Sequence, residues 1–464
     1  RSQTQDRIDE GVLGKETEHD FGDAEMSKGV GHEGTVKFQP ESFTNSSANG
    51  DYSKKVAKHT HLDPEGKSPR ILVIKKTLTV LETLIEKFNT LKMEKGVQGI
   101  EHFPIMVIDD ECDQASVDTK KGEEELSKIN EKIRELLNLF KRKAYIGYTA
   151  TPYANAAINH LAFHKRVGKD LFPKDFIFQL PINSDYVGLN RLFPDISFDE
   201  DGNEIAENYS SNQPLEVIND FIDKYNVYKN FLYKKKEDIY GWMPPAHNKD
   251  HTPQCDGISE IPKSLRRAII YFTLACCVKR LRNKESLKHN SMMIHATRFN
   301  DVQTKITEQV DDFLVSLQST QYEWLNEIED EIFKIWNKNF KEKLNNDYNP
   351  GRKEIEWEEI KEIYGEQVNK IRVQEINNKT KTYLDYREFK ENGKHVIAIG
   401  GNRLSRGLTL EGLNVSYYLR SARTSAVATA TQMGRWFGYR NSYDDVCRIY
   451  MPESTIYLFQ KLHE

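Results

Sequence analysis

Short apolar runs alternate with longer amphipathic segments in the first third of the chain. The runs "RILVIKK" at 70–76, "FPIMVID" at 103–109 and "AYIGYTATP" at 144–152 have the length and composition of buried strands. The segments between them, 77–92 and 122–143, repeat their apolar residues at the three- and four-residue spacing of an amphipathic helix. Alternating strands and helices predict βαβ units and therefore an α/β fold with a doubly wound parallel sheet.

A second series of apolar runs begins near residue 290. The runs "SMMIHATRF" at 291–299, "KIRVQEIN" at 370–377, "HVIAIGG" at 395–401 and "NVSYYL" at 414–419 predict further strands. A second α/β sheet is therefore expected.

The two series suggest how the chain is divided. We expect a first domain at 1–175, an accessory or linker region at 176–290, and a second domain at 291–464 with a mostly helical insertion at about 301–370. The opening residues, "RSQTQDRIDEGVLG", contain no methionine start and no strand before the first helix-like pattern. We therefore expect the first domain to be truncated at its N-terminus.

Composition excludes several classes of protein. The 464 residues, 38% hydrophobic and 30% charged, are typical of a charge-rich globular protein, and no run approaches the ~18 apolar residues of a membrane span. A net charge of −5 gives no bulk electrostatic reason for nucleic-acid binding, although a local basic channel remains compatible with it. Five cysteines without metal-ligand spacing favour a reduced, cytoplasmic protein.

The strand at 103–109 runs directly into Asp110-Glu111-Cys112-Asp113. Open α/β sheets bind ligands at the carboxyl ends of their strands. In a phosphate-hydrolysing site the first carboxylate of such a box holds Mg²⁺, usually through water, and the next polarises the attacking water. The box predicts a magnesium and nucleotide site, with a solvated acidic turn as the alternative.

Such a box is normally accompanied by a glycine loop that cradles the phosphates. The tripeptide Gly66-Lys67-Ser68 has His61 where the first glycine belongs and precedes a strand, so we interpret it as a fortuitous match. Thr149 and Thr151 end the strand that follows the box, where their hydroxyls can hydrogen-bond its carboxylates.

The segment 398–440, "AIGGNRLSRGLTLEGLNVSYYLRSARTSAVATATQMGRWFGYR", is rich in glycine and arginine. Arginines on short glycine-bearing turns suit phosphate, because the guanidinium makes charge-assisted contacts and glycine allows close approach. The candidates are Gly401, Arg406, Gly407, Gln432, Arg435 and Arg440. A solvated basic loop is the alternative.

These motifs, in this order, resemble those of the superfamily-two helicases. More closely, "GYTATPYAN", "HATRF", "GGNRLSRGLTLEGLNVSYYLR" and "QMGRWFGYR" resemble the Z-one domain family, for which endonuclease activity has been suggested and whose members accompany helicase-type ATPases in bacterial defence loci. The resemblance covers about residues 70–464. It implies two RecA-like domains that use ATP and magnesium and act on nucleic acid, expected to be DNA, with nuclease or ATPase proteins as candidate partners and no membrane.

The resemblance also implies roles for individual residues. Asp110 is expected to be the magnesium ligand, Glu111 the water-activating carboxylate, and Arg435 or Arg440 an arginine finger. Thr149 and Thr151 are expected to couple hydrolysis to domain movement. The other nucleotide-binding candidates are Asp113, Gly401, Arg406, Gly407 and Gln432.

The expected function is an ATP-dependent translocase or helicase core in defence or restriction, inactive as residues 1–464 alone because the glycine loop is missing. A metal-dependent endonuclease and a non-catalytic scaffold are the alternatives. For a nuclease, Pro194-Asp195 lacks a downstream Glu-x-Lys on a strand, and Glu359-Ile360-Lys361 is expected in a helix.

Two smaller groups of polar residues have open interpretations. The residues His247, Asp250 and His251 could be metal ligands or part of a polar loop. Lys75 and Lys76 could contact a nucleic-acid phosphate or simply end a strand in solvent. The helicase pattern also has an acidic residue where this chain has Thr409, and it spaces the final arginines differently.

Overall fold

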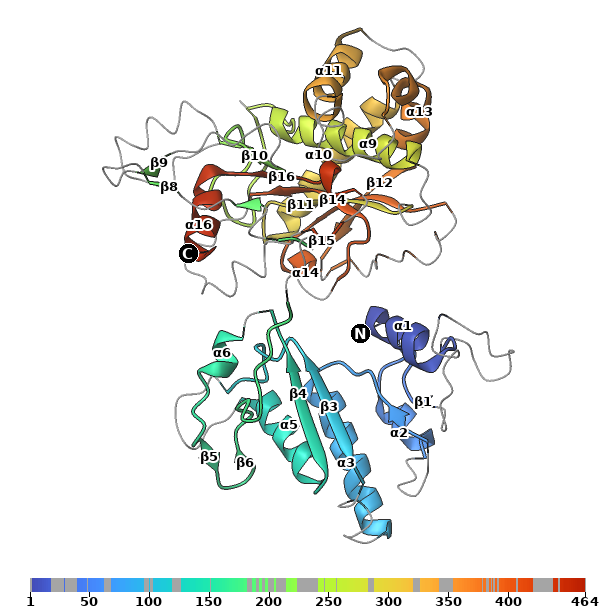
Figure 1. Cartoon of the computed structure of the whole chain (residues 1–464), viewed down its shortest axis with the longest axis vertical. Helices are drawn as coiled ribbons and strands as arrows, with labels where there is room; N and C mark the ends of the chain where they lie inside the picture. The colour runs from blue at the N-terminus through green and yellow to red at the C-terminus, as the bar shows by residue number, and fades with distance from the viewer. Residues whose placement is uncertain are drawn as a thin grey trace. The chain divides into compact units, whose positions relative to one another are not determined.

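The computed structural model divides the chain into two compact units, Arg1–Leu180 and Pro181–Glu464, which Figure 1 colours along the sequence. The structure describes residues 2–17, 29, 40–47, 49–61, 68–95, 100, 103–118, 127–150, 152–181, 186–188, 192–193, 197–198, 204–205, 214–222, 241–245, 247–255, 257–282, 288–319, 326–341, 354–377, 379–380, 384, 386, 389, 392–405, 408–419, 437–440 and 443–463.

The first unit is built on a pair of parallel strands. Strand β3 (Ile105–Asp110) pairs with β4 (Lys143–Tyr148), and Asp110 lies opposite Tyr148. Helices α3 (Leu78–Lys95) and α5 (Lys128–Asn138) pack together beside them, with the rings of Phe88 and Phe140 in edge contact at 5.0 Å. These two strands and two helices confirm the predicted elements, but the expectation of a buried strand at 103–109 is wrong, because Met106 and Ile108 are each 62% exposed.

The remaining elements of the first unit are short. They are α1 (Ser2–Ile8), the π-helical η1 (Asp9–Leu13), β1 (Glu41–Ser42), α2 (Lys54–His59), β2 (Arg70–Ile71), α6 (Tyr153–Ala156), β5 (Phe163–His164) and β6 (Gly168–Lys169). The strand expected at 70–76 is thus only two residues long, paired in parallel with β1.

The second unit contains a six-stranded sheet in the order β10-β16-β14-β11-β13-β12. Its strands are β10 (Leu215–Val217), β11 (Asn290–His295), β12 (Ile371–Ile376), β13 (His395–Gly400), β14 (Leu413–Tyr418) and β16 (Arg448–Met451). Every neighbouring pair is parallel. Strands β11, β13 and β14 are buried along their whole length, as expected for a parallel sheet covered on both faces.

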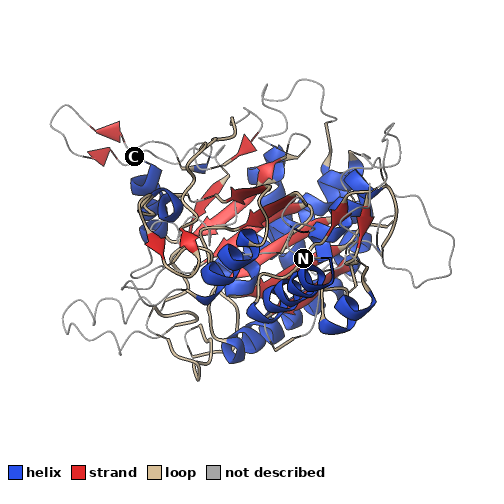
Figure 2. Ribbon diagram, turned by 90° about the horizontal axis from the view of Figure 1, so that it is seen from below, coloured by secondary structure: helices blue, strands red, loops and turns tan. Residues whose placement is uncertain are grey.

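Helices cover both faces of this sheet. Figure 1 shows α9 (Lys263–Leu281), α10 (Asn300–Ser319), α11 (Asn326–Trp336) and α13 (Trp357–Lys370) on one face, and α14 (Asn402–Ser405) and α16 (Glu453–His463) on the other. The alternation along β14 agrees, because Tyr417 hydrogen-bonds Ser264 of α9 whereas Tyr418 packs on Phe459 of α16. Figure 2 shows the same elements coloured by type.

The region expected to be accessory, residues 176–290, contributes directly to this second unit. It supplies strand β10 and helix α9, which is buried along nearly its whole length because it lies between the sheet and α13. The same region contains the antiparallel pair β8 (Ser197–Phe198) and β9 (Glu204–Ile205). A further antiparallel pair joins β7 (Tyr186–Val187) to β15 (Gly438–Tyr439).

The short helical segments η4 (Asn337–Lys341) and η6 (Asp444–Val446) complete the second unit. The predicted α/β class with a parallel sheet is confirmed, whereas the RecA-like architecture of both units stays a prediction. Among the helices that the structure describes, none combines the length and apolar character needed to cross a membrane.

Candidate functional site

Two adjacent aspartates end strand β3 in opposite environments. Asp109 is 5% exposed, and its carboxylate accepts hydrogen bonds from Lys76 Nζ at 2.7 Å and from the Tyr145 hydroxyl at 2.6 Å. Asp110 is exposed. Because successive side chains of a strand point to opposite faces, fixing Asp109 on the inner face directs Asp110 outward.

Lys76 also holds the backbone that follows the strand. Its Nζ donates to the carbonyl oxygens of Asp110 at 3.1 Å and Glu111 at 2.9 Å, in addition to the Asp109 carboxylate. Neither interpretation drawn from the sequence, a phosphate contact or a solvated strand end, describes these contacts. Lys76 is instead a support for the acidic box.

Tyr145 is the second support. Burial, with the neighbouring charge of Asp109, raises the pKa of the Tyr145 hydroxyl far above its ordinary value. The phenol therefore stays protonated and remains a hydrogen-bond donor to Asp109.

Glu111 has an uncommon backbone conformation. Its φ is 55°, in the left-handed region that non-glycine residues seldom occupy. The Glu111 N–H donates to Asp110 Oδ1 at 3.1 Å, and Gln114 Nε2 donates to Glu111 Oε2 at 2.9 Å. Such backbone strain is concentrated at functional sites, so this tight turn after a strand supports a functional rather than a purely solvated turn.

The box is also fastened to the end of β4. The Cys112 N–H donates to the Tyr148 carbonyl at 3.1 Å, and a Cβ on Gly147 would lie 2.6 Å from Cys112 Sγ, so glycine leaves the room that this thiol needs. Burial, with the charges of Asp109 and Asp113, raises the pKa of Cys112 to about 11. Cys112 is therefore a protonated packing residue.

This register brings the predicted Thr-Ala-Thr segment to the box. Thr149 follows Tyr148, which lies opposite Asp110 in the β3 and β4 pair. The hydroxyl-bearing segment and the carboxylates thus share one end of the sheet, as expected. Thr151 lies outside the described residues.

In the second unit, the loops after β11 and β13 meet at the carboxyl edge of the sheet. Gln303 Nε2, near the start of α10, donates to the Thr297 carbonyl at 3.1 Å. A Cβ on Gly401 would lie 2.7 Å from Gln303 Nε2 and 3.0 Å from Thr297 O. Gly401 is therefore a glycine because two loops approach each other closely there, and this edge is where parallel sheets place ligands.

Arg298, from the "HATRF" segment, lies in the same loop. It is exposed, and its guanidinium lies 4.9 Å from the centre of the Phe299 ring. Arg298 makes no hydrogen bond or ion pair with any residue that the structure describes. Sequence reasoning included Arg298 in a motif but did not single it out.

Three lysines also lie near the start of α10. Lys379 Nζ pairs with Asp301 Oδ1 at 2.7 Å, and this hydrogen bond, with the charges of Lys379, Lys249 and Lys305, lowers the pKa of Asp301. Basic side chains therefore gather at this corner of the carboxyl edge, although the net charge of the chain is negative.

Arg440 lies at the other edge of the sheet. Its Nε donates to the carbonyl of Leu413, the first residue of β14, at 3.3 Å, and its Nη1 donates to the Tyr439 carbonyl at 2.8 Å. Its guanidinium also lies 5.6 Å from the centre of the Tyr443 ring. These are contacts that stabilise a loop. The other candidates of this segment, Arg406, Gly407, Gln432 and Arg435, lie outside the described residues.

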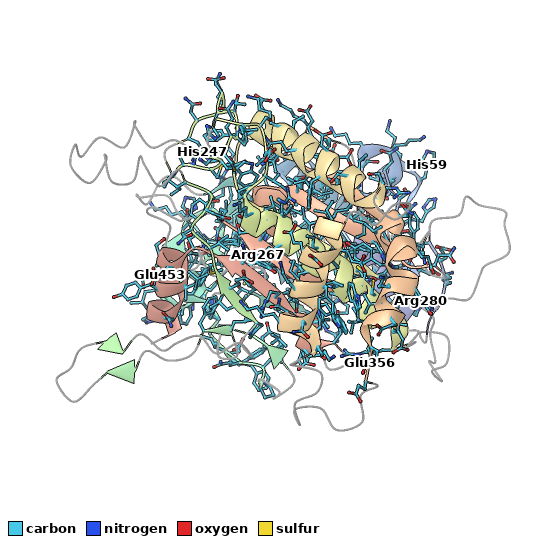
Figure 3. All side chains as sticks on the ribbon, turned by 90° about the horizontal axis from the view of Figure 1, so that it is seen from above. His59, His247, Arg267, Arg280, Glu356 and Glu453 are labelled. Atoms are coloured by element: carbon cyan, nitrogen blue, oxygen red, sulfur yellow. The ribbon has the colours of Figure 1, made fainter. Side chains whose placement is uncertain are left out.

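The histidines at 247 and 251 hold a loop against α10. His247 contacts the Pro244 carbonyl and Thr297 Oγ1, both at 2.7 Å, and His251 Nε2 contacts the Trp242 carbonyl at 2.9 Å. Figure 3 labels His247 in this loop. These hydrogen bonds support the polar-loop interpretation. In the described part of the chain no three His, Cys, Asp or Glu side chains are placed together to hold a metal.

The nuclease-like tripeptide Glu359-Ile360-Lys361 lies within α13, as expected. Ile360 is buried, and Lys361 pairs with Glu329 of α11. The tripeptide is thus part of helix packing. Pro194 and Asp195 lie outside the described residues.

The match to a protein family lies in the second unit. Residues 264–464 match the profile of the Z1 domain. Among solved structures, the "ATP-dependent Type ISP restriction-modification enzyme LlaBIII bound to DNA" matches with a TM-score of 0.34 and 9% sequence identity, covering 90% of this chain and 22% of that chain. The chain thus spans about a fifth of the length of that enzyme.

No curated protein gives a match. The Z1 match begins within α9 and runs through five of the six strands of the parallel sheet, including the loops that carry Arg298, Gly401 and Arg440. It also contains the segments on which the resemblance to the Z-one family was based, apart from "GYTATPYAN". Residues 264–464 of this chain therefore match the Z1 (Z-one) domain, in agreement with the resemblance seen in the sequence.

Proposed function

We propose that this chain is the core of an ATP-dependent DNA translocase or helicase that acts in defence against foreign DNA or in its restriction. The observation that carries the proposal is the end of β3, where Asp110 is exposed while Asp109 is fixed by Lys76 and Tyr145. A strand end that presents one rigidly oriented carboxylate, followed by a second on a strained turn, suits a phosphate-hydrolysing site.

Asp110 would hold the magnesium ion of this site. Mg²⁺ is commonly bound through one or two carboxylates together with water and substrate phosphates, so one exposed aspartate fits the requirement. When bound, the ion would neutralise charge on the phosphates. Asp113 would contribute further polar contacts to the nucleotide.

Glu111 would act as the base that takes a proton from the attacking water. Its carboxylate is half-buried and held by Gln114, which fixes the direction in which it can accept the proton. Thr149 and Thr151 would transmit the state of the nucleotide to the rest of the fold.

The second unit would provide the arginines and glycines that contact phosphate. We assign nucleotide or nucleic-acid contacts to Gly401, Arg406, Gly407 and Gln432, and the arginine finger to Arg435 or Arg440. The backbone carbonyls and the tyrosine ring that engage Arg440 favour Arg435 as the finger.

The basic corner beside α10 would contact the DNA backbone. Arg298 is exposed there, with Lys249, Lys305 and Lys379 nearby, and phosphate contacts of this kind supply much of the affinity for DNA. The match of residues 264–464 to the Z1 domain supports a place in defence.

DNA-stimulated ATP hydrolysis by the natural protein that contains this chain tests the proposal. We expect magnesium-dependent hydrolysis that rises when duplex or single-stranded DNA is added. Arg298→Ala should weaken DNA binding and lower the slope of its salt dependence by about 1, whereas Lys334→Ala, an exposed lysine of α11, should not. Hydrolysis that does not change when DNA is added, or equal effects of the two substitutions on DNA binding, would count against the proposal.

A further inference from the structure

A cavity of about 400 Å³ lies in the helical segment formed by α11 and α13. Its volume is within the usual range of ligand pockets. Figure 1 shows these helices at the outer side of the helical layer, and Figure 3 labels Glu356 at the periphery. Four carboxylates, two aromatic rings and one lysine line the cavity: Glu329, Asp330, Glu356, Glu358, Phe333, Trp357 and Lys341. None of them belongs to the proposed nucleotide site or to the basic corner beside α10.

The aromatic part of the lining is a corner made by two rings. Phe333 and Trp357 meet at a centroid distance of 5.3 Å and an interplanar angle of 67°. Phe333 is 42% exposed, a large value for a phenylalanine, and Trp357 is half-buried in front of Trp336. The faces of such rings attract ammonium and guanidinium groups.

The four carboxylates differ in whether they already have a hydrogen-bond or ion-pair partner. Glu329 pairs with Lys361, and Glu356 forms the capping box of α13 with Glu359. Asp330 and Glu358 are exposed and make no hydrogen bond or ion pair with the described residues. Two carboxylates beside two aromatic rings thus remain available to a cation.

We propose that this cavity binds a lysine or arginine side chain carried by a basic segment of a partner protein. Charge complementarity identifies the partner, because four carboxylates against the single lysine among the lining residues attract a basic peptide and repel nucleic-acid phosphate. The aromatic corner favours the cationic end of a side chain over a bare metal ion. This role is independent of ATP hydrolysis and of DNA binding.

Fluorescently labelled octalysine and octaarginine peptides test the inference by anisotropy with residues 1–464, at low and at physiological salt. The double variant Asp330→Asn/Glu358→Gln should weaken binding at least about threefold, since two charge contacts are lost. The matched control is Glu308→Gln/Asp311→Asn, which removes the same charge from exposed positions of α10 that make no ion pair with the described residues. This control should bind as the unaltered chain does.

Phe333→Ala should weaken binding about two- to fivefold through loss of one ring face, and Phe333→Tyr should retain it. Thermal melts identify any variant that does not fold. If Phe333→Ala does not fold, the Asp330→Asn/Glu358→Gln variant, whose substitutions lie at exposed positions, tests the inference by itself. Equal losses in the α10 control would show a general charge effect and overturn the inference. Absence of peptide binding to the unaltered chain, or unchanged binding by the Asp330 and Glu358 variant, would overturn it as well.

Discussion

The buried carboxylate of Asp109 depends on two partners for its stability. The Asp109 side chain is 4% exposed and the Lys76 side chain is 25% exposed. Of the two partners, Lys76 and Tyr145, Lys76 is the one that carries a positive charge. Removal of one partner from a buried ion pair leaves an uncompensated charge, which costs more than the pair itself contributes. The orientation of Asp110 rests on this pair.

Lys76→Met should therefore lower the free energy of unfolding of the first unit by about 3 kcal/mol. The double variant Lys76→Met/Asp109→Asn should recover part of the loss, because the buried charge is then absent. Chemical denaturation of the two variants and the unaltered chain measures both effects. If the double variant is no more stable than Lys76→Met, the ion pair does not have the assigned role.

A second residue predicts a pH dependence. His395 is 6% exposed at the start of β13, and burial lowers its pKa from about 6.5 to about 3. Between these values the unfolded chain binds a proton that the folded chain does not, so stability is complete above pH 6.5 and is lost as the pH falls.

From pH 7 to pH 5 the unaltered chain should lose about 2 kcal/mol more stability than His395→Gln, which keeps an acceptor for Asn290 Nδ2. Denaturant unfolding at the two pH values provides the comparison. Equal pH dependence in both proteins would mean that another group is responsible.

The residues at the end of β3 show how far the sequence could be used. Asp110 and Glu111 could be identified, because an acidic box after a short apolar run is a local pattern. The roles of Lys76 and Tyr145 could not, since their bonds to Asp109 span 33 and 36 residues. Arg298 is a charged residue close to the end of a predicted strand, which is a common position for a functional side chain. No local feature of the sequence distinguished it from other surface arginines.

At the scale of elements, the loop after β13 is fitted tightly against the start of α10. A methyl group at Gly401 would overlap the Gln303 amide and press on the Thr297 carbonyl. Space, and not an unusual φ, is therefore the reason for glycine at this position.

Gly401→Ala should destabilise the second unit by about 1–3 kcal/mol, the usual cost of overpacking. Gly11→Ala is the control, because a Cβ there would have no neighbour within 4 Å. Thermal unfolding compares the two. A Gly401→Ala protein as stable as the control would show that the loops can separate freely.

The elements that could be predicted are those with a long periodic pattern. Helices α3, α5 and α10 and the six-residue strands repeat their apolar residues often enough to be recognised. Strands β10 and β16 have three and four residues, too few for a pattern, and their pairing joins Leu215 to Ile449. For this reason the contribution of residues 176–290 to the second sheet was not expected.

At the scale of the whole molecule, we expect residues 1–464 to be unable to hydrolyse ATP by themselves. Residues 1–464 contain no glycine loop of the pattern that cradles phosphates, and Gly66-Lys67-Ser68 matches it only in part. This chain alone should therefore show no magnesium-dependent ATP hydrolysis, with or without DNA. Robust hydrolysis that depends on Glu111 would return Gly66-Lys67-Ser68 to consideration as the phosphate site.

The central claim is that the carboxylates at the end of β3 perform ATP hydrolysis, and one comparison tests it directly. In the natural protein that contains this chain, ATP binding and hydrolysis are measured for Glu111→Gln and for Glu82→Gln, an exposed glutamate of α3. We predict that Glu111→Gln binds ATP but hydrolyses it at least about 100-fold more slowly, because the proton acceptor is lost, while Glu82→Gln is unaffected. Near-normal turnover by Glu111→Gln would contradict the account.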